Sequence, residues 1–167
     1  DEGPKSGKQC VTIRPRVEGA RPFGNVMQQI DATPFCGKRV RFRAAVRTEV
    51  EGDEGRAQLW LRVDRTREKG QHRMGFFDNM HDRPIRKKDW DYYEIVGDIA
   101  EDAETINVGM IFVGSGQAWM DDTSLEIVQQ DAEVTGRGLR GVSFDDIGPG
   151  LLEIAGAMEL KLKPSLT

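Results

Sequence analysis

The chain has 167 residues, of which 38% are hydrophobic and 31% charged, so it is long enough for one domain with a hydrophobic core. Its net charge of −4 disfavours a general nucleic-acid role, because phosphate binding needs a dominant positive field. No apolar run approaches the roughly 20 residues of a membrane-spanning helix. The chain begins at Asp1 without a methionine or a visible signal peptide, as expected of a processed mature form or a cloned fragment.

Taken in chain order, the pattern is that of short strands joined by turns. Residues 1–9 are polar and aperiodic, which predicts a loose N-terminal arm. The segment 40–47 alternates apolar residues with arginines, as a strand with one wet face does, and 58–64 alternates in the same way. No part of 10–128 shows sustained helical periodicity. The predicted strands are 10–14, 25–31, 40–47, 58–64, 74–78, 90–99, 106–113 and 118–128.

The spacing of these strands predicts an all-β fold, an antiparallel β-sandwich of the jelly-roll kind over residues 10–130. Residues 131–167 form a C-terminal extension outside that pattern. A helical stripe favours a short helix over 151–163, with a final strand as the alternative, and the stripe consists of Leu151, Ile154, Ala155, Met158 and Leu162. Such a tail would pack on its own domain or dock on a partner.

Three short motifs follow one another in this chain: G-K-x-V-x-F from Gly37, W-x-x-Y from Trp90, and aromatic-x-Asp-Asp from Trp119. In this order they resemble galactose-binding-like domains, the jelly rolls that include many carbohydrate-binding modules of bacterial secreted proteins. The resemblance covers residues 24–128. It implies a periplasmic or extracellular module with a carbohydrate or protein partner. Similar domains are appended to bacterial peptidases and regulators.

In modules of this type an aspartate of the last strand often helps to hold a structural calcium, and Asp121 is the residue that this implies here. If Leu125 faces the core, a period of two places Trp119 and Asp121 on the same inner face. An inward carboxylate needs a cation or hydrogen bonds. The alternative to calcium is that Asp121 accepts backbone N–H groups from a neighbouring loop.

Trp60 and Arg62 are the first candidates for ligand binding. They lie on the face opposite Leu59 and Leu61, where an indole could stack on a sugar ring and a guanidinium could bond its hydroxyls. The alternative is that other segments cover Trp60.

Arg41 and Arg43, with Arg47, form a second candidate stripe, suited to acidic ligands. Such a stripe is also typical of a solvated face matched by acidic residues on neighbouring strands.

Cys10 and Cys36 leave three alternatives open: two free thiols, a disulfide that ties the first strand to the second, or a catalytic thiol. The loop 77–84 could hold a metal, but an internal pair of Asp78 and Arg83 fits its composition better.

The sequence lacks a G-x-S-x-G elbow, a phosphate loop and a G-x-G-x-x-G motif. We therefore expect a non-catalytic binding module, which the resemblance places in the bacterial envelope, without a cofactor other than the calcium that the resemblance allows. The alternative is a structural subunit of a larger assembly, which docks through the sandwich face and the C-terminal tail.

Overall fold

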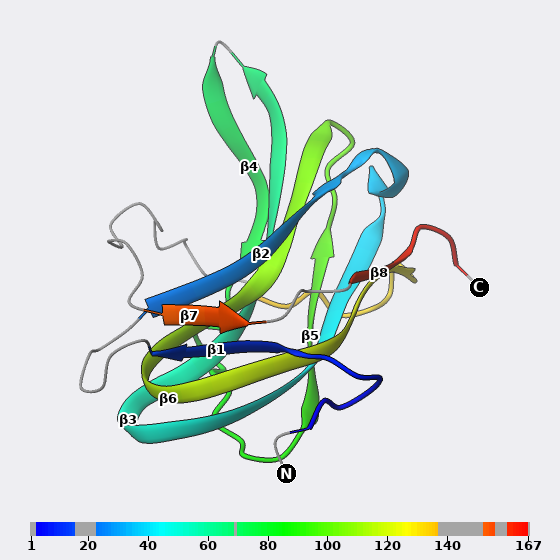
Figure 1. Ribbon diagram of the computed structural model, residues 1–167. Helices are drawn as coiled ribbons and strands as arrows, with labels where there is room; N and C mark the ends of the chain where they lie inside the picture. Colours follow the sequence, from blue (N-terminus) through cyan, green and yellow to red (C-terminus); the bar gives the residue numbers. More distant parts are fainter. Residues whose placement is uncertain (1–2, 16–22, 69, 137–151, 156–159, 167) are drawn as a thin grey trace.

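The computed structural model describes residues 3–15, 23–68, 70–136, 152–155 and 160–166 (Figure 1). Eight strands and one short 3-10 helix, η1, account for its regular structure. The described residues contain no α-helix, and none of their helices is long and apolar enough to cross a membrane. The elements are β1 (Val11–Pro15), β2 (Phe23–Asp31), η1 (Thr33–Phe35), β3 (Arg39–Glu68), β4 (Gln71–Asp78), β5 (Asp91–Asp98), β6 (Ala103–Val128), β7 (Leu152–Ala155) and β8 (Leu160–Lys163).

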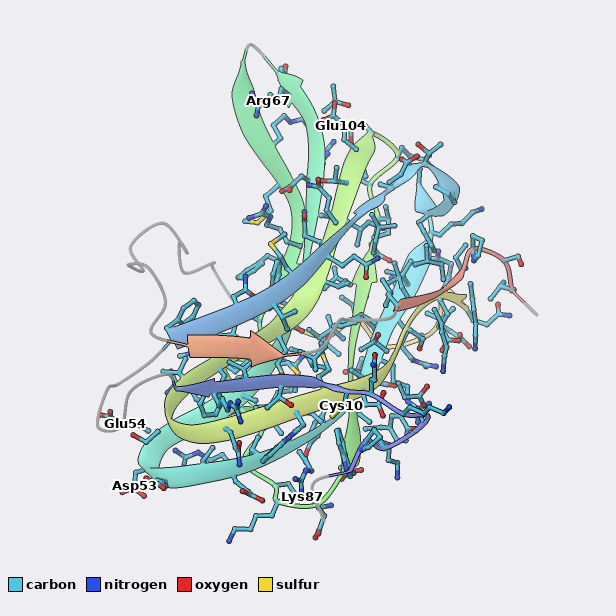
Figure 2. The ribbon with its side chains drawn as sticks, in the orientation of Figure 1. Cys10, Asp53, Glu54, Arg67, Lys87 and Glu104 are labelled. Carbon is cyan, nitrogen blue, oxygen red and sulfur yellow. The ribbon has the colours of Figure 1, made fainter. Side chains whose placement is uncertain are left out.

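Two very long strands, β3 and β6, form an antiparallel ribbon that is folded over on itself. Their pairing runs from Arg39 opposite Val128 to Glu51 opposite Ser115, breaks, and resumes from Arg56 opposite Val113. The bend lies where Gly114 has a φ of +89°, a conformation that glycine adopts without strain. Figure 2 shows Asp53 and Glu54 at this bend and Arg67 at the far end of the β3–β4 hairpin.

The folded ribbon gives the two layers of a sandwich, although hydrogen bonds connect all eight strands into one sheet. In the first layer, the first half of β3 pairs with β5 and with the second half of β6, which also contacts β1 and β8. β7 extends this layer beyond β1. In the second layer, the second half of β3 lies between β4 and the first half of β6, and β2 adds the last strand. The predicted all-β antiparallel sandwich is confirmed.

The core fills the space between the layers and comes from alternate positions of the ribbon. Phe42, Leu61 and Leu125 are all fully buried, as the period-two pattern predicts. They belong to one apolar cluster with residues from both halves of β3 and β6, among them Val108. Burial of one such side chain stabilises the fold by about 1.5–3 kcal/mol.

A β-bulge at Asp122 corrects the predicted orientation of the neighbouring residues. The pairing of β3 with β6 shifts register between Arg43 and Ala45, and Asp122 has a φ of +45°. One extra residue reverses the alternation, so Met120 joins the core cluster beside Leu125. Trp119 and Asp121 therefore face outward, where a strict period of two predicts that they face inward.

The C-terminal segment also differs from the prediction. Leu152–Ala155 forms β7, which pairs with β1, and Leu160–Lys163 forms β8, which runs parallel to β6. The favoured helix over 151–163 is therefore wrong where the structure describes it, and the strand alternative is correct; Leu151 and Met158 lie outside the described residues. The described strands of the tail, β7 and β8, belong to the sheet.

The N-terminal arm is docked rather than loose. Ser6 N donates to Asp121 Oδ2 at 2.6 Å, and Trp90 Nε1 donates to the Gly3 carbonyl at 3.3 Å. The Lys5 ammonium lies 5.8 Å from the centre of the Tyr92 ring. These contacts hold the arm against the outer face of the first layer.

Candidate functional site

The outer face of the second layer carries an unusual density of polar side chains, and we call it the polar face. It is built from cross-strand rows, because side chains at alternate positions of neighbouring strands share a face. Gln29 pairs with Asn107, which pairs with Arg62, and Met27, Gly109 and Trp60 form the next row. The polar face consists of Asn25, Met27, Gln29, Gln58, Trp60, Arg62, Asp64, Phe77, Asn107 and Gly109.

A chain of hydrogen bonds crosses three strands of the polar face. Gln29 Nε2 donates to Asn107 Oδ1 at 3.2 Å, and Asn107 Nδ2 donates to Asp64 Oδ2 at 2.9 Å. Arg62 Nη2 donates to the same oxygen of Asp64 at 3.0 Å. Asn107 is fully buried and Asp64 is 8% exposed. The buried Asn107 and Asp64 therefore fix the positions of the more accessible Gln29 and Arg62 side chains.

Trp60 lies on this face, as predicted, but its indole is only 2% exposed. Its Nε1 donates to Asn25 Oδ1 at 2.8 Å, so the ring reaches across β6 to β2. Gly109 makes this possible, because a Cβ at that position would lie 3.0 Å from Trp60 Nε1 and would overlap the Val26 carbonyl. The structure therefore corrects the prediction of an exposed stacking platform: Trp60 is covered.

The accessible part of the polar face combines a cation with apolar surface. The Arg62 side chain is 32% exposed. Met27 of the adjacent row is 47% exposed. Gln29 is exposed as well. A ligand would meet the Gln29 amide and the Arg62 guanidinium beside the flexible apolar side chain of Met27.

Arg41 and Arg43 lie on the other layer, apart from Trp60 and Arg62. Arg41 lies within 3.2 Å of Glu94 and 3.4 Å of Glu126. The Arg43 guanidinium lies 3.7 Å from the centre of the Tyr92 ring. These contacts agree with the alternative that the sequence left open, a solvated face matched by acidic residues on neighbouring strands. Ligand binding by Arg41 and Arg43 stays a prediction.

Asp121 accepts hydrogen bonds from backbone N–H groups, the alternative to calcium. Its Oδ2 accepts from Ser6 N at 2.6 Å and its Oδ1 from Asp122 N at 2.7 Å. Within the part of the chain that the structure describes, no cluster of three or more His, Cys, Asp or Glu residues could hold a metal. Asp121 anchors the N-terminal arm through Ser6, and a structural calcium at this residue stays a prediction.

The Asp122 carboxylate, at the bulge, accepts hydrogen bonds from side chains of two other strands. Its Oδ1 accepts from Lys161 Nζ of β8, and its Oδ2 accepts from the Tyr92 hydroxyl at 2.7 Å. The Lys161 hydrogen bond, followed by that of Tyr92, lowers the pKa of the Asp122 carboxyl. The carboxylate therefore links both β8 and β5 to β6 at Asp122.

Both cysteines are free thiols, which corrects the disulfide alternative. Cys36 Sγ lies 3.5 Å from the carbonyls of Ala32 and Ala103, close to η1. Cys10 lies near Asp121, and burial, with the Asp121 charge, raises the pKa of its thiol. A raised pKa opposes the thiolate that a nucleophile needs.

The loop between β4 and β5 is structural, as its composition suggested. Asp78 is fully buried and accepts from Arg83 Nη2, from the Thr135 hydroxyl at 2.7 Å and from Met80 N at 2.9 Å. Met80 has a φ of +52°, so this carboxylate stabilises a strained turn. Asp78 and Arg83 pair internally, as expected.

Comparison with known proteins gives one relative and several similar structures. No protein-family model matches the chain. The uncharacterized HTH-type transcriptional regulator YbfP of Bacillus subtilis (strain 168) is 34% identical over 146 residues, or 87% of this chain. The chain spans 46% of that protein, about half its length.

Several of the similar solved structures are carbohydrate-binding modules. A family 16 carbohydrate-binding module has 9% identity and a TM-score of 0.48, with 72% of this chain and 78% of that chain covered. The C-terminal family 22 module of Clostridium thermocellum Xyn10B has 13% identity and a TM-score of 0.49, with 73% and 74% covered. At such identities the likeness concerns the fold and not the ligand.

Asn25, Asp64 and Asn107 were not identified as site residues from the sequence. Part of the signal was present, because Asn107 interrupts the otherwise apolar run 106–113. Such residues meet only if their strands are neighbours in the sheet. Strand order depends on contacts between residues far apart in the sequence, such as Asp64 and Asn107.

Proposed function

We propose that this chain is a non-catalytic module that binds a sugar-like, polyhydroxylated ligand on its polar face. The observation that supports this most is the hydrogen-bonded row of Gln29, Asn107, Asp64 and Arg62. Sugar hydroxyls both donate and accept, so the Gln29 amide and the Arg62 guanidinium, held in place by the buried Asn107 and Asp64, complement them. The exposed Met27 offers apolar contact for the C–H face of a ring.

We infer that this module has a sensing role within a regulator. The relative from Bacillus subtilis is named as a transcriptional regulator, and the chain corresponds to about half of it. In a protein divided in this way, one part would bind the ligand and the other part would regulate transcription. The envelope location that the resemblance implies remains a prediction, and two free thiols fit a reducing compartment at least as well.

The alternative of a structural subunit that docks through its tail receives less support from the described residues. β7 and β8 pair with β1 and β6, so the described part of the tail already has partners within the chain.

A glycan array followed by calorimetric titration of the best-bound glycan tests the proposal, with two matched variants. Arg62→Gln removes the exposed cation of the polar face. Arg41→Gln removes a cation of the same 32% exposure that is also ion-paired but lies on the other layer. A charge-assisted hydrogen bond contributes about 1.5–3 kcal/mol, so we expect Arg62→Gln to weaken binding roughly 10- to 100-fold.

Arg41→Gln should bind like the wild-type protein. If no glycan binds, or if both variants lose affinity equally, the proposed site is wrong.

A further inference from the structure

The N-terminal arm crosses a gap in the strand pairing of the first layer. On the edge of β6 that faces away from β3, β1 pairs as far as Met120, and β8 pairs from Thr123 onward. Asp121 and Asp122, at the bulge, therefore have no described strand beside them on this edge. The arm lies there instead, because Ser6 N donates to Asp121 Oδ2 at 2.6 Å.

A cavity of about 580 Å³ separates the arm from this part of β6. Its wall consists of residues 6–11 on the side of the arm, and of residues 120–123 with Lys161 on the side of the sheet. Cys10 belongs to the wall, and Figure 2 shows Cys10 at the start of β1. Ligand pockets have volumes of roughly 300–1,000 Å³, so a small ligand fits this space.

Four charged side chains line the cavity, and two of them neutralise each other. Lys161 Nζ donates to Asp122 Oδ1. The other two are Lys8 of the arm and Asp121 of β6. Neither Lys8 nor Asp121 forms an ion pair with any described residue, including each other. One positive and one negative charge therefore line the cavity without a charged partner from the described part of the chain.

The Asp121 carboxylate can accept more hydrogen bonds than it does. Its two oxygens accept one backbone N–H each, from Ser6 and from Asp122. An ionised carboxylate offers about four acceptor positions, and an ammonium group of a ligand would fill one of those that remain.

Lys8 and Asp121 together indicate which ligand chemistry suits the cavity. A ligand with a single charge would complement only one of them. A small zwitterion would complement both, with its ammonium group on Asp121 and its carboxylate on Lys8.

We propose that this cavity is a second binding site, which takes a small zwitterion with an ammonium and a carboxylate group, as in an amino acid or a short peptide. Asp121 binds the ammonium group, Lys8 binds the carboxylate, and the arm forms the outer wall. The site lies on the first layer and is independent of the polar face, so either site can fail without the other.

Nuclear magnetic resonance of the backbone amides tests this proposal on the whole chain at pH 7. The probes are glycine, a free amino acid, and glycylglycine, a short peptide. We expect saturable shifts of residues 6–11 and 120–123 with at least one probe, with half-saturation at millimolar concentration. Glycinamide lacks the carboxylate and N-acetylglycine lacks the ammonium group, so each should bind about 10-fold more weakly, because each loses one charge-assisted hydrogen bond.

Two variants of the arm complete the test. Lys8→Gln should weaken binding of the zwitterion about 10-fold and leave binding of glycinamide unchanged, because glycinamide has no carboxylate for Lys8. Lys5→Gln is the matched control, since Lys5 is a cation of the same arm that lies over the Tyr92 ring and outside the cavity wall. Both lysines are exposed, so both variants should fold.

Three results would overturn the proposal. The first is the absence of saturable shifts at residues 6–11 and 120–123 with both probes. The second is binding of glycinamide or N-acetylglycine as tight as that of the zwitterions. The third is an equal loss of affinity in Lys5→Gln and Lys8→Gln.

Discussion

Replacement of Gly109 by alanine tests how the polar face is built. Gly109 is buried and does not need a left-handed backbone, so the effect of an added methyl group is steric. The new Cβ would overlap the Val26 carbonyl and lie 3.0 Å from both Met27 Cα and Trp60 Nε1. β2 must therefore move away from β6, and the hydrogen bond from Trp60 to Asn25 is lost.

Overpacking of this kind costs about 1–3 kcal/mol and the lost hydrogen bond about 1 kcal/mol, so we expect Gly109→Ala to lower the free energy of unfolding by about 2–4 kcal/mol. Urea denaturation followed by tryptophan fluorescence measures this, provided that the slope against urea stays unchanged. Gly3→Ala is the control, because an added Cβ there meets nothing within 4 Å. A Gly109→Ala protein within 0.5 kcal/mol of the wild type would refute the close approach of Trp60 and β2 to this glycine.

Three further predictions concern the supporting structure. Asp78→Ala should lower the free energy of unfolding by about 2–4 kcal/mol, because a buried carboxylate with three hydrogen-bond donors is removed. In the same urea experiment, Asp82→Ala should change the free energy of unfolding by less than about 0.5 kcal/mol. Asp122 has a pKa below its ordinary 3.8, so its charge stabilises the fold above that pH and the benefit is lost as the pH falls through the lower folded value. Thermal unfolding should accordingly separate Asp122→Asn from the wild type at neutral pH and bring the two together in acid; a constant gap would contradict the ion pair. Ellman titration of the unfolded chain without reductant should count both Cys10 and Cys36, and native Cys10 should react slowly at pH 8; a single thiol or none would indicate a disulfide.

The sandwich could be predicted because alternation along each strand is a local property. Residues 40–47 and 58–64 have clear alternation, and both are strands with their apolar residues in the core. That they are halves of one strand, β3, was not evident, because the bend near Gly52 looks like an ordinary turn in the sequence. Pairing with β6 on both sides of the bend makes the ribbon continuous.

The errors share one cause, which is that distant residues decide the outcome. A single inserted residue at Asp122 reverses the side on which Asp121 lies, and no local pattern marks the bulge. The stripe over 151–163 favours a helix, but the described parts of this segment pair as strands with the edges of β1 and β6. Trp60 was placed on the correct face, but its burial and its partner Asn25 depend on β2.

The most direct test of the account is a map of backbone amide shifts during titration with the glycan that the array identifies. The account predicts that the largest shifts fall on residues 25–29, 58–64 and 105–109, the three strands of the polar face. Shifts confined to residues 41–47 of the first layer, or no shift with any glycan, would contradict it.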